Sequence, residues 1–498
     1  MAQVAAELTP ADAPPREQHW TEIRLGALMG RLMYPGGLTA ASRHAGAEPI
    51  WTGRTAPYDE SSLRRFARRL EQTGAVPVLS RAVQRQVERA VEASGTVAVG
   101  HTDMYDQVHW SKKSAHAAPI GGRANQLLGA VYIGLTTVRL GGEGDRTGPV
   151  LAYHASWHKP ASPLVDALKE LHADPQRHAW LTTNLGLHIW DRGGNGVGVL
   201  TWSREQRIPY LTVANGWVYL SSQKRPTLLT PDGHSVFVRR DVRLPTSTDS
   251  DTPAARIVIF PARPDLGERA KRGLRYPTNA DLSVQQLEQL NVEYKSRWPA
   301  IENQIKGLIA DGFGVNRTRI LTKTTSRGHD GKLARSVERE TELLGRIARA
   351  RKDPSDDTAF AEALKAFPKI IGERVKREQL EVNRVEKGAR LPGHGELLCK
   401  NLMLLMHNAL VLLLAKSPIE AVRAMTCQRV RALLLAQPAL TLIERGQTTL
   451  CIQQVTDAEQ RPLQQELVRL FNERVTLRMR DGPKLTLRLM QLRGIKRR

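Results

Sequence analysis

Residues 97–106 read Val-Ala-Val-Gly-His-Thr-Asp-Met-Tyr-Asp, an apolar run that ends in acidic residues. Such a run predicts a buried strand that carries carboxylates to the edge of a sheet. Val97, Val99, His101 and Asp103 alternate along it and therefore share one face of the strand. We expect Asp103 to project from the sheet where this strand ends.

Short apolar runs and helical stretches continue outward from this strand. They predict strands at residues 96–103, 127–136, 149–156, 185–191 and 209–213, and helices at residues 163–172 and 197–206. Three consecutive strands followed by helix, strand, helix and strand is the order of a ribonuclease-H-like core, an α/β sheet that begins with an antiparallel meander. Other α/β folds share parts of this order.

The chain of 498 residues is too long for one hydrophobic core, and its length predicts about three domains. Composition and pattern divide it into a flexible leader (1–19), a helical DNA-binding region (20–95), the first part of the core (96–213), a β-rich insertion (214–260), the last part of the core with the helix of Glu302 (261–315), a charged helical region (316–390) and a mixed α+β region for DNA-end or dimer contacts (391–498).

The charge of the chain indicates a polyanionic partner. Lys and Arg number 73 against 50 Asp and Glu, so the formal net charge is +23. Because self-repulsion opposes folding, such an excess favours nucleic-acid binding. Four arginines at i, i+4 spacing predict a phosphate-binding side of one helix, with a solvated helix face as the alternative. They are Arg64, Arg65, Arg68 and Arg69.

Several function classes are excluded by the motifs that the sequence lacks. Three distant cysteines form neither a disulfide framework nor a zinc site. No phosphate-binding loop of the ATPase type and no complete dinucleotide-binding glycine pattern occurs, so no nucleotide cofactor is expected. The N-terminus does not resemble a secretory signal, and polar residues interrupt the apolar stretch 397–415. We therefore expect a cytoplasmic protein with no membrane partner.

Three acidic residues fit the requirements of phosphoryl transfer on DNA. That chemistry uses two divalent cations about 4 Å apart, which hard carboxylate oxygens hold. Asp103 and Asp191 end predicted strands, and Glu302 lies early in a predicted helix. Open α/β sheets collect such residues at one edge. The sequence thus predicts a site for two Mg²⁺ or Mn²⁺ ions, held by these three side chains.

The segments around these acids resemble those of DDE transposases of bacterial insertion sequences, the group with a Tyr-Arg-Glu-Lys signature. Asp103 and Asp106 stand in the stretch that resembles the first segment, and Asp191-Arg-Gly resembles the second. The third segment is the most specific, and its residues occur in the order Tyr294, Arg297, Trp298, Glu302 and Lys306. One more residue separates Arg297 from Glu302 than in the commonest spacing, and Lys306 follows one helical turn after Glu302 rather than two.

The resemblance implies an enzyme that cleaves DNA at the inverted-repeat ends of a mobile element and joins the freed 3′-hydroxyl to target DNA. It implies catalysis by Asp103, Asp191 and Glu302, with Asp106 as the alternative first ligand. It also implies DNA contacts by Tyr294, Arg297, Trp298 and Lys306, two Mg²⁺ or Mn²⁺ ions, double-stranded DNA as partner, and a homodimer in the DNA complex.

Each candidate residue also has an ordinary structural explanation. Asp191 precedes glycines and is a typical helix cap. Glu302 and Lys306 form an i, i+4 pair typical of an exposed helix face, and Trp298 is as compatible with a core as with a base stack. Two other functions share these features. One is a nuclease of the same fold without strand transfer, and the other is a DNA-binding derivative that has lost activity.

Overall fold

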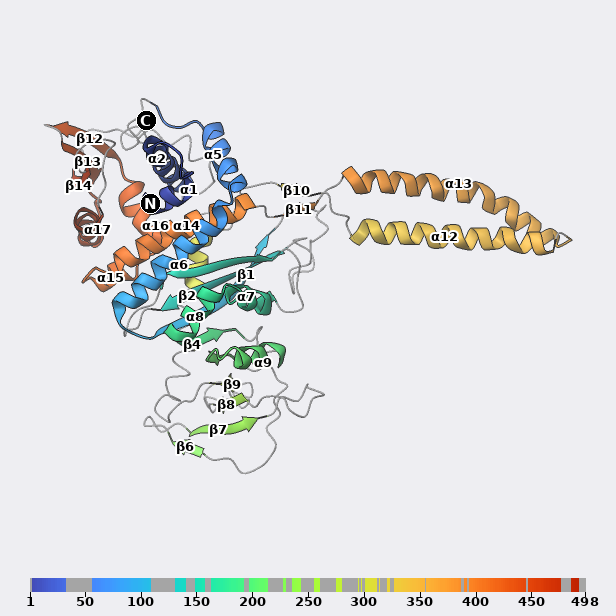
Figure 1. The fold of residues 1–498 in the computed structure, drawn as a ribbon, viewed down its shortest axis with the longest axis horizontal. Coiled ribbons are helices and arrows are strands. Elements are labelled where there is room, and N and C mark those ends of the chain that lie inside the picture. The colour runs from blue at the N-terminus through green and yellow to red at the C-terminus, as the bar shows by residue number, and fades with distance from the viewer. Residues whose placement is uncertain are drawn as a thin grey trace.

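Figure 1 shows the computed structural model, a mixed α/β protein. The structure describes residues 2–32, 56–108, 130–139, 148–156, 163–191, 197–213, 227–229, 235–242, 255–259, 275–279, 294, 297, 301–310, 313, 320–322, 327–353, 355–386, 389–391, 394–444, 447–475 and 485–491.

Nine strands form one sheet in the described part of the chain, in the order β3-β2-β1-β4-β5-β9-β8-β7-β6. Their bounds are β1 Ala98–Val108, β2 Ala130–Arg139, β3 Val150–Ser156, β4 Leu185–Trp190, β5 Tyr210–Leu211, β6 Thr227–Leu229, β7 Ser235–Val242, β8 Ala255–Ile259 and β9 Arg275–Thr278. β1, β2 and β3 pair antiparallel, while β4 runs parallel to β1 and β5 parallel to β4.

The predicted order of elements between residues 96 and 213 is confirmed, with boundaries shifted by a few residues. The helices here are α7 (Pro163–Leu171), α8 (Pro175–Asn184) and α9 (Val197–Glu205). The sequence pattern did not predict α8, whose start is capped by Asp174 and followed at once by Pro175. Trp190 and Tyr210, on neighbouring strands, are buried beneath α7 and α9.

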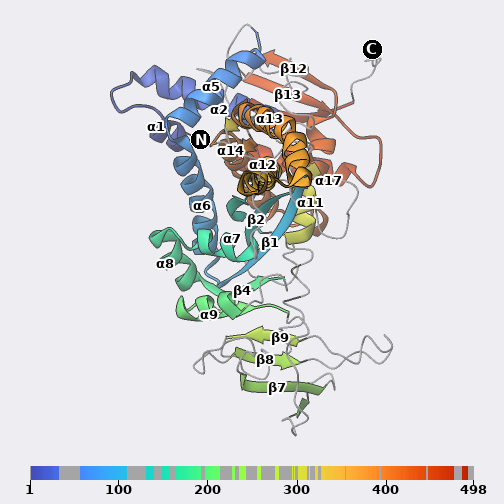
Figure 2. The same cartoon turned by 90° about the vertical axis from the view of Figure 1, so that its right-hand side faces the viewer.

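The strands of the predicted insertion continue the same sheet rather than form a separate one. β9 pairs antiparallel with β5, and β8, β7 and β6 follow outward. Figure 2 shows β9, β8 and β7 in this order. Polar side chains hold this junction. Thr278 Oγ1 donates to the carbonyl of Tyr210 at 2.5 Å, and Asn279 bonds both the amide of Tyr210 and the carbonyl of Ile208 at 2.8 Å.

The described helices before the sheet are α1 (Ala2–Leu8), α2 (Pro15–Leu32), α5 (Glu60–Gln72) and α6 (Ala75–Ser94). Residues 1–19, expected to be a flexible leader, are therefore largely helical. Ala5 is fully buried, and Glu7 forms a salt bridge of 2.8 Å with Arg85 on α6. Alanine-rich segments have high helix propensity, and burial of one helical face fixes this one in place.

The long apolar helix α14 (His394–Leu414) is a core element that packs against α6, α5, α2 and β3. Its stretch Leu397–Leu414 is long and apolar enough to cross a membrane by length and composition, contrary to the expectation from sequence. However, 61% of that stretch is buried inside the protein. Asn408 accepts from the amide of Val150 at 2.7 Å and donates to its carbonyl at 2.8 Å, which ties α14 to the edge strand β3.

The described residues of the charged region 316–390 contain two long helices, which form a hairpin that the sequence pattern did not predict. Its arms are α12 (Arg327–Lys352) and α13 (Asp357–Glu386), which lie side by side and project away from the sheet (Figure 1). A short antiparallel pair, β10 (Ile320–Thr322) and β11 (Ala389–Leu391), closes the base of the hairpin.

The C-terminal region is mixed α+β, as predicted, and has its own apolar core. A three-stranded sheet contains an antiparallel hairpin and a strand that returns parallel after a helix. The elements are α15 (Glu420–Arg423), α16 (Cys427–Val430), the π-helical turn η6 (Arg431–Leu435), β12 (Ala439–Glu444), β13 (Gln447–Gln453), α17 (Arg461–Arg474) and β14 (Leu485–Met490).

Candidate active site

The three predicted carboxylates lie around one guanidinium group. Arg297 Nη1 is 2.5 Å from Asp103 Oδ2, and Arg297 Nη2 is 2.7 Å from Glu302 Oε1. Asp191 Oδ1 lies 3.9 Å from the same Nη2 atom. Segments that are far apart in the sequence therefore meet within one small cluster, which we call the carboxylate cluster (Asp103, Asp191, Glu302 and Arg297).

Sheet topology brings the two aspartates together. β1 and β4 are parallel neighbours, and their register pairs Thr102 with Trp190. Asp103 and Asp191 are the next residues on the two strands, so they lie side by side where the pairing of β1 with β4 ends. Asp191 directly follows β4, as predicted, but the expectation that Asp103 ends its strand was wrong, because β1 continues to Val108 in its pairing with β2. Thr212, just after β5, donates from Oγ1 to the Asp191 carbonyl at 3.1 Å and anchors the backbone there.

A π-helical turn presents Glu302 to Arg297. Ile301 and Glu302 adopt this conformation immediately before α11 (Asn303–Ala310). In a regular α-helix, five residues of separation would leave Arg297 and Glu302 rotated by roughly 140° about the axis. A π-helical turn contains more residues than an α-helical turn, and Glu302, which adopts this conformation, contacts Arg297 directly. Such turns are rare and concentrate at functional sites.

Arg297 is charged and nearly enclosed, with its side chain 11% exposed. Burial alone would lower the pKa of Arg297, but the neighbouring Asp103, Tyr294, Asp191 and Glu302 outweigh burial, and its pKa is raised. A buried guanidinium needs such neighbours because desolvation of an unpaired charge is costly. The carboxylates in turn depend on this one cation, since like charges placed this close repel.

Tyr294 contacts two members of the cluster. Its hydroxyl donates to Asp191 Oδ1 at 3.3 Å, and its ring lies 5.6 Å from the Arg297 guanidinium carbon. Burial, with a further contribution from Asp191, raises the pKa of Tyr294 to about 12 even though Arg297 opposes the shift. Tyr294 is therefore a neutral hydrogen-bond donor at physiological pH and orients Asp191.

A buried polar network fixes the helix that follows Glu302. Gln304 Nε2 donates to the Gly148 carbonyl at 2.6 Å and contacts His407 Nε2 at 2.7 Å, so that α11 is joined to the start of β3 and to α14. His407 Nδ1 lies 3.2 Å from the Cys427 sulfur. Burial lowers the pKa of His407 to about 4, so this histidine is neutral within the network.

Sequence reasoning missed Gln304 and Thr212, although one of them left a signal. Ile301, Gln304, Ile305 and Leu308 recur at the spacing of one helical face, and all four are buried. A glutamine in the middle of an otherwise apolar stripe indicates a buried hydrogen-bond partner. Thr212 left no comparable signal, because only the neighbouring strand reveals what its hydroxyl reaches.

The donor set of the cluster suits a hard divalent cation. Three carboxylates supply oxygen ligands of the kind that Mg²⁺ and Mn²⁺ prefer. In the described part of the chain, no three ligand side chains converge closely enough to hold a metal ion, and Arg297 lies among these carboxylates. The residues fit such ions chemically, on the condition that Arg297 gives up its contacts with them.

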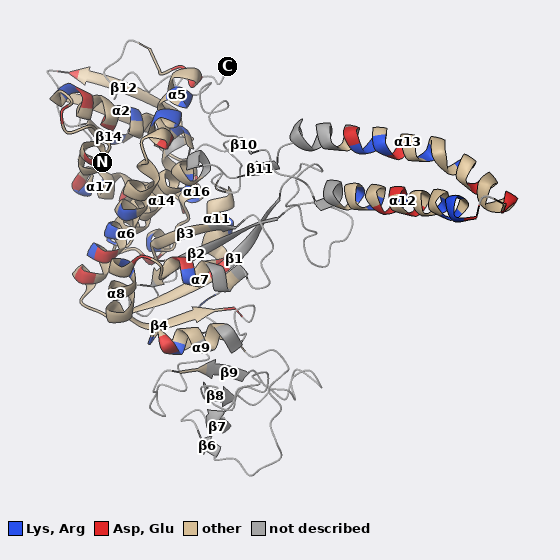
Figure 3. Cartoon of the chain, turned by 45° about the vertical axis from the view of Figure 1, so that its right-hand side comes forward, with Lys and Arg blue, Asp and Glu red and all other residues tan. Residues whose placement is uncertain are grey.

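The other predicted site residues lie in different settings. Lys306 is exposed on α11, whereas Trp298 and the side chain of Asp106 fall outside the described residues. Arg297 is engaged by carboxylates rather than displayed on the surface as a DNA contact. On α5 the four arginines are all exposed, on the side away from the buried Leu63, Phe66 and Leu70. Figure 3 shows this basic helix near α2.

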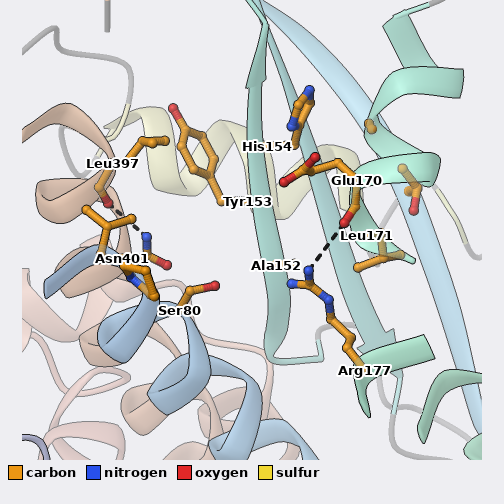
Figure 4. A pocket seen from close by; sticks show the side chains of 13 residues that line it. Ser80, Ala152, Tyr153, His154, Glu170, Leu171, Arg177, Leu397 and Asn401 are labelled. Atoms are coloured by element: carbon orange, nitrogen blue, oxygen red, sulfur yellow. Dashed lines mark hydrogen bonds between the residues drawn. The ribbon is translucent and has the colours of Figure 1, made fainter. Parts of the chain in front are cut away.

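A cavity of about 370 Å³ lies at the edge strand β3, apart from the carboxylate cluster. Figure 4 shows it between α6 and α14 on one side and α7 and α8 on the other. Glu170, His154 and Arg177 are its ionisable lining residues, and Arg177 is bonded to the Glu170 carbonyl at 3.2 Å. None of the three predicted carboxylates lines this cavity.

No model of a known protein family matches this chain, and no curated protein matches it either. What the protein does is therefore to be inferred from its own residues.

Proposed function

We propose that this protein is a DDE-type DNA transposase of an insertion sequence. The observation that carries the proposal is the meeting of Asp103, Asp191 and Glu302 around Arg297. These residues were selected from sequence segments that resemble the three catalytic segments of that group. Ordinary roles as a helix cap or a surface ion pair do not require the three to meet.

The topology of the first five strands supports a ribonuclease-H-like core. An antiparallel meander of β1, β2 and β3 is followed by two strands parallel to β1, added on the other side of it. In this proposal Asp103 and Asp191 lie side by side where the pairing of the central strands β1 and β4 ends, and Glu302 joins them from the start of α11. The π-helical turn at Glu302 supports the same assignment, because it accommodates the one residue by which this chain exceeds the usual spacing after the arginine.

The proposed chemistry assigns a role to each residue of the cluster. When bound, two Mg²⁺ or Mn²⁺ ions would activate the attacking oxygen and stabilise the leaving oxygen, with no need for ATP. Asp103, Asp191 and Glu302 would hold them, and Tyr294 would keep Asp191 oriented through its hydroxyl. Arg297, released from the carboxylates, would contact the phosphate that is cleaved.

Two successive reactions at the same site follow from this assignment. Water attacks a phosphodiester at the end of the element, which frees a 3′-hydroxyl. That hydroxyl then attacks a phosphodiester of target DNA and releases a target 3′-hydroxyl, so that the number of phosphodiester bonds is conserved in the second step. The partners in this proposal are the inverted-repeat ends, the target duplex and a second copy of the chain, in a bacterial cytoplasm and on the nucleoid when bound to DNA.

The proposal is tested with the purified full-length protein and a plasmid that carries its own gene with long flanks. We expect double-strand breaks at the element borders with Mg²⁺ or Mn²⁺ and none with EDTA. Joined products in a second plasmid separate a transposase from a nuclease of the same fold. Tight binding of this DNA without nicking or cleavage in either metal would refute the enzyme and favour a DNA-binding derivative.

The arginine side of α5 is expected to contact DNA phosphates. Changing Arg64, Arg65, Arg68 and Arg69 to glutamine should lower the magnitude of the slope of log affinity against log salt by about 3.6, because each of the four phosphate contacts contributes about 0.9. Fluorescence anisotropy with labelled element-end DNA at several salt concentrations measures this slope.

The control removes the same amount of charge elsewhere. Lys332, Arg335, Arg339 and Arg349 on α12 are exposed, and their replacement by glutamine should leave the slope unchanged if α5 is the contact surface. Equal slopes for wild type and the α5 variant would show that this helix face is merely solvated.

A further inference from the structure

The hairpin α12–α13 leaves one of its faces apolar and uncovered by the described part of the chain. The two helices pack through a seam that contains buried apolar residues and polar contacts between the helices. Ser336 Oγ donates to Glu373 Oε2 at 2.7 Å, and Arg374 forms an ion pair with Glu340 at 2.6 Å. Beside this seam lies a second set of large apolar side chains, which are exposed to solvent. They are Val337, Leu344, Phe360, Leu364, Phe367, Ile371 and Val375, with exposed fractions from 44% to 62%.

These exposed residues occupy one side of the hairpin, and we call them the apolar face. On α12, Val337 directly follows the seam residue Ser336, and on α13, Phe367 and Ile371 directly follow the buried Ala366 and Ile370. One step along a right-handed helix rotates a side chain by about 100°. Because the two helices run in opposite directions, the same step on each one turns toward the same side of the pair.

The spacing of the apolar face is that of a helix-packing seam. Phe360, Leu364, Phe367 and Ile371 follow one another at intervals of four, three and four residues, which is the heptad pattern of helices that pack side by side. A partner made of helices with the same spacing fits it best.

The size of the face matches that of a stable interface. Seven side chains of this size at these exposures present on the order of 600 Å² of apolar surface, near the roughly 800 Å² that each partner buries in a standard interface. The opposite side of the hairpin is mainly charged, with Lys332, Arg335, Arg339, Lys365 and Lys369 exposed there. Only the apolar face is therefore suited to burial, and Figure 3 shows how far the hairpin extends from the body of the protein.

We propose that the apolar face docks onto the same face of a second copy of this chain, so that two hairpins form a four-helix bundle. A two-fold interface uses one surface twice, and the apolar part of this face runs from Val337 to Leu344 on α12 and from Phe360 to Ile371 on α13. The exposed Arg374 lies beyond Ile371, where Glu340 pairs with it. Phe367, near the middle of the stripe, lies close to the two-fold axis. This inference gives the dimer of the proposed function its surface, but it makes its own prediction for the protein without DNA.

The test measures the mass of the full-length protein in solution without DNA by sedimentation velocity and light scattering. Wild type is expected at the mass of two chains. The double variant Leu364→Glu and Phe367→Glu should weaken association at least about 100-fold, since two central apolar contacts are each lost twice. The matched control, Lys365→Gln with Lys369→Gln on the charged side, makes the same change in net charge and should remain dimeric. Circular dichroism checks that each variant is folded.

A cross-linking measurement keeps the test valid if the glutamate variant fails to fold. All three native cysteines are buried, so a cysteine placed on the hairpin reacts alone. Phe367→Cys should form a disulfide-linked dimer on mild oxidation, and Lys365→Cys should not. A monomeric wild type at about 100 μM, or equal cross-linking of both variants, overturns the proposal. Because no DNA is present, either result is independent of whether the protein cleaves DNA.

Discussion

Asp191→Asn is expected to reduce metal-dependent cleavage of element-end DNA by at least about 1000-fold, because one carboxylate of the cluster loses the charge that a divalent cation requires. The side chain of Asp191 is 42% exposed and lies 3.9 Å from Arg297, so an asparagine of nearly equal shape should leave the fold intact. Single-turnover cleavage of a labelled DNA end measures the loss, and an unchanged melting temperature shows that it is chemical. Glu302→Gln and Asp103→Asn should have similar effects.

Two carboxylates provide controls for this prediction. Glu170 lies in the same part of the protein but lines the separate cavity at β3, so Glu170→Gln should retain nearly full activity. Asp106→Asn settles which aspartate of the first segment is used. Asp103 forms the ion pair with Arg297, so we expect a loss of less than about tenfold for Asp106→Asn. Activity of Asp191→Asn within tenfold of wild type would contradict the proposed site.

The melting temperature of the protein is expected to fall steeply as the pH drops below about 6.5. Burial lowers the pKa of His172 and His188 to about 3 and that of His407 to about 4, with neighbouring histidines adding to the shift for the first two. Between these values and about 6.5, the unfolded chain binds protons that the folded chain does not, so stability decreases as pH falls. Above pH 7 these histidines are neutral in both states and contribute no slope.

The size of this effect is large because three histidines act together. Each contributes about 1.4 kcal/mol per pH unit within its window, or roughly 4 kcal/mol per unit in total. Over about two pH units, the resulting loss of unfolding free energy becomes comparable with the 5–15 kcal/mol stability of a typical domain. Urea unfolding followed by circular dichroism at pH 7, 6 and 5 measures the dependence.

Single substitutions separate these histidines from general acid effects. His188→Gln retains a partner for Thr102, whose Oγ1 lies 2.7 Å from His188 Nε2, and should reduce the slope by about a third. The exposed His19 serves as control, and His19→Gln should leave the slope unchanged. A flat stability profile from pH 7 to pH 5 would mean that these histidines are not buried in the neutral form.

The order of the core elements was predictable from sequence because each strand there is a short apolar run between breakers. β3 and β4 were placed within a few residues, and Asp191 follows β4 as expected, whereas β1 continues five residues beyond Asp103 to Val108. The pairing of β1 with β4 was not predictable, because the sequence of a strand does not reveal which other strands will lie beside it. The adjacency of Asp103 and Asp191 depends on that pairing.

The surroundings of Arg297 could not be predicted from the local sequence pattern. As part of a sequence motif, this arginine was expected to contact phosphate, because exposed arginines near a cleaved strand commonly do. In the structure it lies among three carboxylates that come from distant segments. Similarly, the alanine-rich N-terminus was expected to be flexible, because the composition of a segment does not reveal whether neighbouring helices will bury it, as they bury Ala5.

The way the chain leaves and re-enters the sheet at β5 and β9 has a consequence for how the protein evolves. Leu211 and Thr278 are paired neighbours, so the sixty-odd residues between them begin and end within about 5 Å of each other, the spacing of adjacent strands. A segment whose two ends nearly coincide can be lengthened, shortened or exchanged without moving the framework on either side. Selection can therefore remodel this segment while β1 and β4, which hold Asp103 and Asp191 side by side, stay unchanged.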